Sequence, residues 1–171
     1  MWLHTVGYRL RQVRQQLGFV APLSEEDYQQ VASVLPSSAA LALFRSMSPA
    51  DQQHALRVCR GLQARGCTDT DMLAAALLHD IGKAHNRVPF WTRPAIVLGK
   101  KLAPQLLSRL VIHPTPIPKW RQSLSNAWYH ADIGADLAAS TGLSERAVLY
   151  IRTHHQPGGP AAALHAIDEV S

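Results

Sequence analysis

The chain contains 171 residues, of which 47% are hydrophobic, so it is long enough for one domain with a sizeable core, and two domains are not expected. Lys and Arg number 17 against 12 for Asp and Glu, and the net charge of +5 should attract phosphate-bearing molecules. The basic residues are scattered without interleaved aromatics, and no stretch reaches the roughly twenty apolar residues of a membrane span, so neither a specific nucleic-acid site nor a spanning segment is expected.

The N-terminal part of the chain is expected to form helices that pack on the rest of the domain. Residues 1–20 carry apolar side chains three and four apart, which predicts an amphipathic helix; three arginines beside this stripe leave open that it lies on a membrane surface. A capping residue, Ser24, predicts a helix that ends before Pro36, and a short helix should follow over 38–47. We therefore assign 1–44 to N-terminal helices and 45–171 to the core.

The next predicted helix, over 48–66, carries the first histidine of interest. Ser48 is a capping residue, Pro49 suits the first helical position, and Gly66 supplies the stop. His54 lies one turn before the core residue Val58, at the edge of the buried face. By itself, a histidine in that place is more often a core or surface residue than a metal ligand.

Two cysteines, Cys59 and Cys67, lie near the end of this helix. The first residues of the chain contain no apolar run of signal-peptide length. We therefore expect a cytoplasmic protein in which both cysteines are reduced thiols.

A His-Asp pair at the end of an apolar helix is the centre of the sequence pattern. Residues 71–78 are apolar on every side after the initial acid, which predicts a helix buried all round. His79 and Asp80 follow at its buried end, where an ionised carboxylate needs a cation or a metal as partner. Gly82 is expected to end the helix, and Lys83 to bring a positive charge to the same corner.

Residues 84–126 are divided by prolines. Two helical pieces are predicted, over 94–102 and 104–112, and this apolar segment is a candidate lid or homodimer contact. Four polar residues here are candidate phosphate ligands or ordinary surface residues: His85, Asn86, Arg87 and His113. Of these, we assign Arg87 to substrate binding.

Three more histidines lie on predicted helices near the C-terminus. A helix over about 125–142 carries His130 on its apolar stripe, and the next carries His154 and His155 at the core end of its apolar face. Two adjacent buried imidazoles need four polar partners, which packing alone does not provide. A final helix contains Asp168. No segment indicates a β-strand of consequence, so the predicted fold is all-α, a single bundle of about seven or more helices.

In chain order, these residues resemble the ligand set of the HD-domain metal-dependent phosphohydrolases. That family has an isolated His, a His-Asp doublet roughly one helix later and a final Asp, which are similar to His54, His79-Asp80 and Asp168. Some members, such as the HD-GYP cyclic-dinucleotide phosphodiesterases and a group of diadenosine-tetraphosphate hydrolases, have extra histidines in between. The resemblance covers about 45–171, and the extra histidines here are His130, His154 and His155.

The resemblance implies an HD-domain bundle with two divalent metals. It implies that His54, His79, Asp80 and Asp168 hold the first metal, and that Asp80 bridges to a second held by His130, His154 and His155. Because no thiolate is among these ligands, the set disfavours structural zinc and suits iron, manganese, nickel, cobalt or magnesium. A bridging water would attack phosphorus, with Asp80 as the catalytic metal bridge and Lys83 neutralising and binding the phosphate of the substrate.

One difference from the HD-GYP pattern narrows the expected substrate. After the paired histidines, that pattern continues with an acid and Gly-Tyr-Pro, whereas this chain reads Gln156-Pro157-Gly158-Gly159-Pro160, which argues against cyclic-dinucleotide cleavage. We therefore expect hydrolysis of a nucleotide or a related small phosphoester. Two alternatives stay open: an HD protein that senses metal or nucleotide without turnover, and a di-iron oxygenase.

Overall fold

The computed structural model describes residues 20–85 and 128–171, apart from the side chains at 84 and 85, and these residues form helices and no strand. The predicted all-α class is therefore confirmed. The helices are α2 (Glu25–Val34), α3 (Ser38–Arg45), α4 (Pro49–Ala64), α5 (Thr70–Leu78), α6 (Ile81–His85), α10 (His130–Ser140), α11 (Glu145–Thr153) and α12 (Ala162–Asp168).

Several predictions concern residues outside this described part. They include the amphipathic helix over 1–20, both helical pieces of 84–126, the lid or homodimer contact, and Arg87. The division into N-terminal helices and a core within one domain also stays a prediction.

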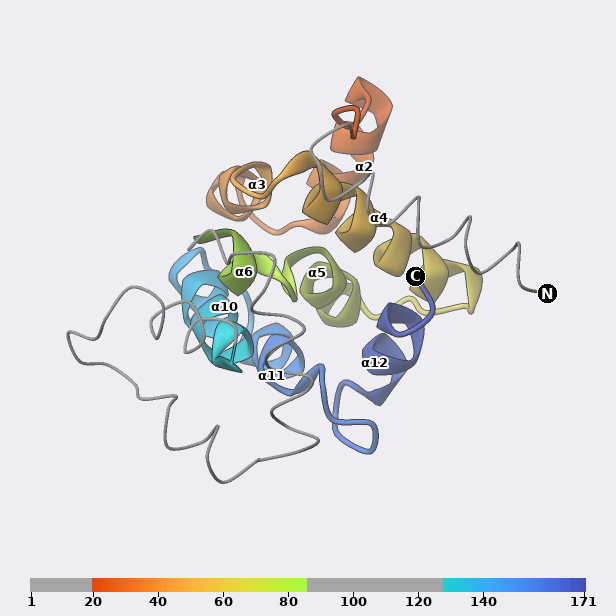
Figure 1. The fold of residues 1–171 in the computed structure, drawn as a ribbon, viewed down its shortest axis with the longest axis vertical. Helices are drawn as coiled ribbons and strands as arrows, with labels where there is room; N and C mark the ends of the chain where they lie inside the picture. The colour runs from red at the N-terminus through yellow and green to blue at the C-terminus, as the bar shows by residue number, and fades with distance from the viewer. Residues whose placement is uncertain (1–19, 86–127) are drawn as a thin grey trace.

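Helix α5 lies at the centre of the described helices (Figure 1). It packs against α2, α4 and α11, and every side chain from Met72 to Leu78 is buried. An apolar surface on all sides of a short helix is stable only where neighbours cover all of it. The sequence prediction of a helix buried all round is thus confirmed, and the His-Asp pair follows its C-terminal end.

The other end of α5 is held at the surface by polar contacts. Asp69 caps the helix by accepting from the backbone N–H groups of Asp71 and Met72. Asp71 accepts from the Ser144 hydroxyl at 2.7 Å and from the Arg146 guanidinium at 2.7 Å. These hydrogen bonds, the one from Ser144 foremost, lower the pKa of the Asp71 carboxyl. They also align the N-terminal ends of α5 and α11.

Local signals set most of the other helix ends as expected. Ser24 forms a capping box with Asp27 at the start of α2, and Ser48 with Pro49 starts α4. Gly66 has φ +82°, in the left-handed region that favours glycine after a helix. No described helix has the length and apolar character needed to cross a membrane, and Cys59 and Cys67 are both free thiols.

The prediction that Gly82 ends the apolar helix is wrong, because α5 already ends at Leu78 and Gly82 lies inside α6. The glycine instead allows a close approach between α6 and α10. A Cβ atom on Gly82 would lie 2.0 Å from the carbonyl oxygen of His130 and 2.9 Å from the backbone nitrogen of Gly134. Since backbone atoms cannot give way cheaply, only glycine fits here. This contact sets α10 beside α6, which begins directly after the His-Asp pair in the chain (Figure 1).

Candidate metal centre

The first cluster of ligand-type side chains comprises His54 from α4, His79 after α5, and Asp168 at the end of α12; we call it the mixed group. One ligand atom from each residue lies within 4.8 Å of the others. The Nε2–H of His54 donates to Oδ1 of Asp168 at 2.8 Å, and Nε2 of His79 lies 3.4 Å from the same oxygen. Two imidazoles thus converge on one carboxylate oxygen.

The position of the mixed group follows from the packing of α4 against both α5 and α12. At the crossing of α4 and α12, a Cβ on Gly61 would lie 2.8 Å from the side chain of Ile167. Glycine there lets α12 approach α4 closely. Buried Leu164 and Ile167 fix the face of α12, which leaves Asp168 directed at His54.

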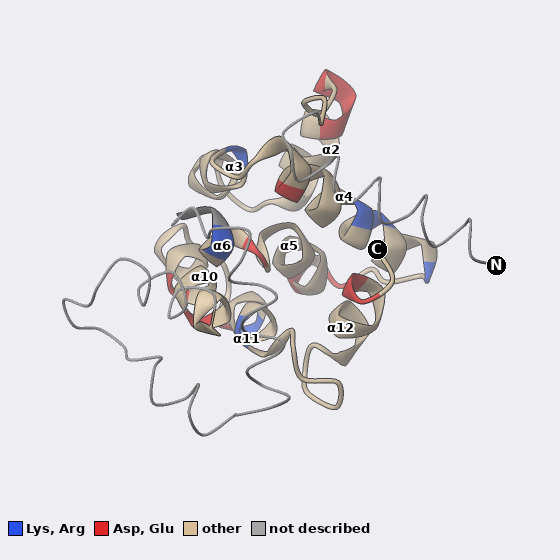
Figure 2. Ribbon diagram, viewed as in Figure 1, with Lys and Arg blue, Asp and Glu red and all other residues tan. Residues whose placement is uncertain are grey.

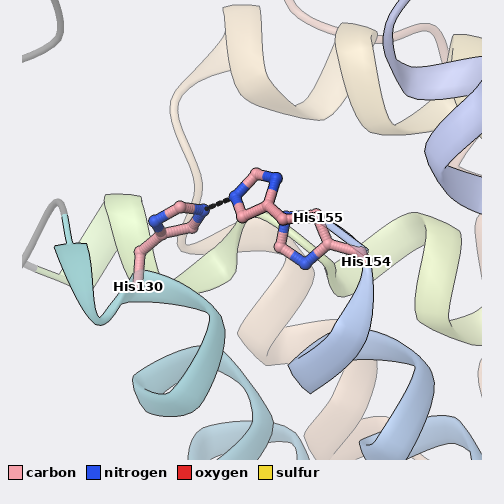
Figure 3. Close-up of side chains that lie close together, drawn as sticks. All are labelled: His130, His154 and His155. Atoms are coloured by element: carbon pink, nitrogen blue, oxygen red, sulfur yellow. Dashed lines mark hydrogen bonds between the residues drawn. The ribbon is translucent and has the colours of Figure 1, made fainter. Parts of the chain in front are cut away.

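The second cluster, the three-histidine group, consists of His130, His154 and His155. His130 is the first residue of α10, and the other two follow α11 (Figure 3). Nε2 of His130 and Nε2 of His155 are 2.8 Å apart and share a hydrogen bond (Figure 3). His154 is fully buried, whereas His155 is exposed. The group therefore has a buried side and a solvent side.

Asp80 lies between the two groups and faces both. Its Oδ2 is 3.6 Å from Nε2 of His79, and its Oδ1 is 3.9 Å from Nε2 of both His130 and His154. Oδ1 is also 2.6 Å from the ammonium nitrogen of Lys83, with which Asp80 forms an ion pair. A single buried carboxylate thus connects the mixed group, the three-histidine group and one lysine.

Backbone carbonyls orient the two most buried imidazoles. Nδ1–H of His79 donates to the carbonyl of Ala76 at 2.8 Å, and Nδ1–H of His154 donates to that of Ile151 at 2.6 Å. A carbonyl only accepts, so the proton is on Nδ1 and Nε2 faces the cluster. Both Nε2 atoms are buried without a hydrogen-bond partner. Such atoms are costly unless a ligand completes them, and histidine ligands of metals are commonly oriented in this way.

The carboxylates are held in their ionised form. Burial would raise the pKa of Asp80, but the nearby ammonium of Lys83, with His79 and His130, holds it well below the usual value. Burial acts the same way on Asp168, but the hydrogen bond from His54 and the nearby imidazole of His79 hold its pKa far below the usual range. Both side chains are therefore negatively charged at neutral pH, the form that binds cations.

The two buried imidazoles differ in their electrostatic surroundings. Burial, assisted by His79 and His155, lowers the pKa of His154 to about 3, so its ring is neutral at ordinary pH. Burial also acts to lower the pKa of His79, but the carboxylates of Asp80 and Asp168 outweigh it and raise that pKa. The mixed group thus attracts positive charge more strongly than the three-histidine group does.

His165 makes a hydrogen bond that supports the centre, although the sequence analysis assigned it no role. Nδ1 of His165, on α12, donates to the carbonyl oxygen of His154 at 3.1 Å. It connects the helix that carries Asp168 to the corner that carries the paired histidines. The signal available in sequence was weak: a histidine one turn before Asp168 on the same helix.

Six of the seven residues predicted as metal ligands thus lie in two adjoining clusters, and the seventh, Asp80, lies between them with Lys83 against it. Arg87 lies outside the described residues. Buried His and Asp groups of this composition can hold a metal ion. Comparisons of the chain with models of protein families, with curated proteins and with solved structures found no match.

Proposed function

We propose that the chain is a metal-dependent phosphohydrolase of the HD type that acts on a nucleotide or a related small phosphoester. The observation that supports this most strongly is the position of Asp80, a buried carboxylate with a cluster of ligand-type side chains on each side. The unpartnered Nε2 atoms of His79 and His154 lie one in each cluster. Two cation sites that share Asp80 would give each of these buried atoms a partner.

In this proposal, the mixed group and Asp80 hold one divalent ion, and the three-histidine group and Asp80 hold the other. Imidazole and carboxylate ligands favour iron, manganese, nickel, cobalt or magnesium, and the lack of thiolate makes zinc the weaker candidate. Such a pair of ions lowers the pKa of a bound water and neutralises charge at phosphorus. The chain itself orients the ligands through the carbonyls of Ala76 and Ile151.

The substrate would approach from the partly exposed side of the centre. The side chains of His54, Asp168 and Lys83 are 23%, 19% and 24% exposed, and His155 is exposed. Lys83 is placed to neutralise a phosphate oxygen there, and the net charge of +5 favours anionic ligands. Because no Gly-Tyr-Pro follows the paired histidines, a nucleotide or simple phosphoester is favoured over a cyclic dinucleotide. The two free thiols are compatible with a cytoplasmic location.

The experiment has two stages. Metal content is first measured on the 171-residue chain purified without chelator. Phosphate release is then measured from a panel of nucleotides with added manganese, iron, nickel, cobalt or magnesium. Asp168→Asn and Glu169→Gln form a matched pair, since each replaces a carboxylate by an amide and Glu169 is exposed. We expect metal-dependent phosphate release that Asp168→Asn abolishes and Glu169→Gln keeps.

The other outcomes contradict the proposal in distinct ways. Metal and nucleotide binding without turnover would instead support a sensor. Oxygen consumption by the iron form without phosphate release would support a di-iron oxygenase. Protein that binds no divalent ion under any condition would overturn the metal centre itself.

A further inference from the structure

The two carboxylate oxygens of Asp80 have different neighbours. Oδ2 faces His79 of the mixed group, at 3.6 Å, whereas Oδ1 faces His130 and His154 of the three-histidine group, each at 3.9 Å. The ammonium nitrogen of Lys83 lies 2.6 Å from Oδ1. The ammonium of Lys83 thus contacts the same oxygen that would bind a cation held by the three-histidine group.

Among the described residues, Lys and Arg lie on α3, α6 and α11 and within or just after α4, and the one on α6 is Lys83 (Figure 2). It is three residues beyond Asp80 and its side chain is 24% exposed, against 6% for Asp80. The ammonium therefore reaches the buried carboxylate from the solvent side. A flexible four-carbon stem lets it withdraw to solvent without unfolding α6.

We propose that Lys83 competes with the second divalent ion for Oδ1 of Asp80, and that binding of this ion at the three-histidine group displaces the ammonium toward the substrate side. This inference rests on the proposed metal centre. It makes Lys83 a regulator of metal occupancy as well as a phosphate ligand. Lys83 can bind the phosphate of the substrate only after the second ion has displaced it from Oδ1 of Asp80.

The competition should affect the two groups unequally. The mixed group has its own carboxylate, Asp168, and faces the other oxygen of Asp80. The three-histidine group contributes only imidazoles, and the carboxylate oxygen that lies 3.9 Å from both His130 and His154 is Oδ1 of Asp80. A cation held 2.6 Å from that oxygen repels a second cation at short range in a poorly solvated site. The second ion should therefore bind more weakly than the first.

The test is a titration of the 171-residue chain with Mn²⁺ alone, in which free Mn²⁺ is followed by electron paramagnetic resonance. Wild type should bind in a strong and a weak step. Lys83→Met removes the charge and keeps the length, and it should tighten the weak step about tenfold or more. The strong step should change by no more than about threefold. Lys83→Gln repeats the test with a polar side chain, and Lys83→Arg, which keeps the charge, should behave like wild type.

Two further variants test whether the change in Mn²⁺ affinity arises at Lys83 and the three-histidine group. Arg65→Gln removes one exposed positive charge just after α4 and should alter neither step. In His154→Ala the weak step should be missing, and adding Lys83→Met should then change nothing. Two steps in wild type that neither Lys83→Met nor Lys83→Gln tightens would overturn the competition and leave the metal centre standing. If wild type binds no Mn²⁺ or other divalent ion, the metal centre fails as well.

Discussion

The mixed group and the three-histidine group lie on either side of one carboxylate, yet they differ in charge and in exposure. The mixed group has Asp168 as a charged member, and its three side chains are buried or partly buried. The three-histidine group has no charged member of its own, and one of its rings, His155, is exposed. The comparison indicates that cation binding at the three-histidine group depends on Asp80, whereas the mixed group retains Asp168.

The two groups are nevertheless in direct contact. The ring centroids of His54 and His79 are 5.4 Å apart, and those of His79 and His154 are 5.2 Å apart. The ring of His154 in turn lies 5.5 Å from that of His130. A continuous row of imidazoles therefore passes Asp80, and a substitution in one group should alter metal binding at the other.

The largest effect is expected from Asp80→Asn, which removes the carboxylate that both groups face. Turnover should fall by several orders of magnitude, and binding should weaken at both groups, most at the three-histidine group. Phosphate release and Mn²⁺ titration measure the two effects. If the weak step of Mn²⁺ binding is still present in Asp80→Asn, the proposed dependence of the three-histidine group on Asp80 is wrong.

Removal of metal should have the next largest effect, now on stability. An ion at about one hundred times its dissociation constant stabilises the folded state by about 2.7 kcal/mol. For a chain of this size, chelation should therefore lower the melting temperature by about 5 to 10 °C. Asp80→Asn serves as the control, because its melting temperature should respond less to chelator. An unchanged melting temperature in wild type would count against a bound metal.

A smaller effect is expected from Gly82→Ala, because the new methyl group would meet the His130 carbonyl at 2.0 Å. Overpacking of this kind costs about 1 to 3 kcal/mol, measurable by urea unfolding. Gly158→Ala is the matched control, since a Cβ there meets nothing within 4 Å. Mn²⁺ binding at the three-histidine group should weaken more than at the mixed group, because α10 would shift. Equal stability of Gly82→Ala and wild type would refute the close approach.

The smallest effect is expected at the opposite end of α5, where Asp71 accepts from Ser144 and Arg146. The pKa of Asp71 is lower in the folded state than its ordinary value of 3.8, so its contribution is present above that pH. The contribution is lost as the pH falls through the lower folded pKa. Because the site is exposed, Asp71→Asn should cost less than about 1 kcal/mol at pH 7 and leave Mn²⁺ binding unchanged. If Asp71→Asn also weakened Mn²⁺ binding, the expectation that the N-terminal end of α5 acts independently of the metal centre would be wrong.

The features that were predictable from the sequence are those set by neighbouring residues. The apolar run over 71–78 is buried all round because no side of it is polar, and Ser24 and Ser48 cap the helices that they precede. The resemblance of the ordered His and Asp residues to the HD ligand set predicted which side chains would lie close together. The apolar run and the helix caps are signals that act within one or two helical turns, which a single sequence displays directly.

The features that sequence reasoning missed depend on partners far along the chain. Gly82 is required by the backbone of α10, which begins 48 residues later at His130, so its role could not be separated from that of a helix stop. The hydrogen bond from His165 to the carbonyl of His154 spans a loop between two helices. The contact between Lys83 and Oδ1 of Asp80 likewise depends on where α6 turns.

The number of divalent ions bound per chain tests the central claim most directly. It is measured at saturating Mn²⁺ on folded wild type, Asp168→Asn, His154→Ala and the control Glu169→Gln. Two cation sites that share Asp80 predict about two ions in wild type and in Glu169→Gln, and about one in each of the other two variants. Wild type that holds one ion or none, or His154→Ala that still holds two, would contradict a centre built from both groups.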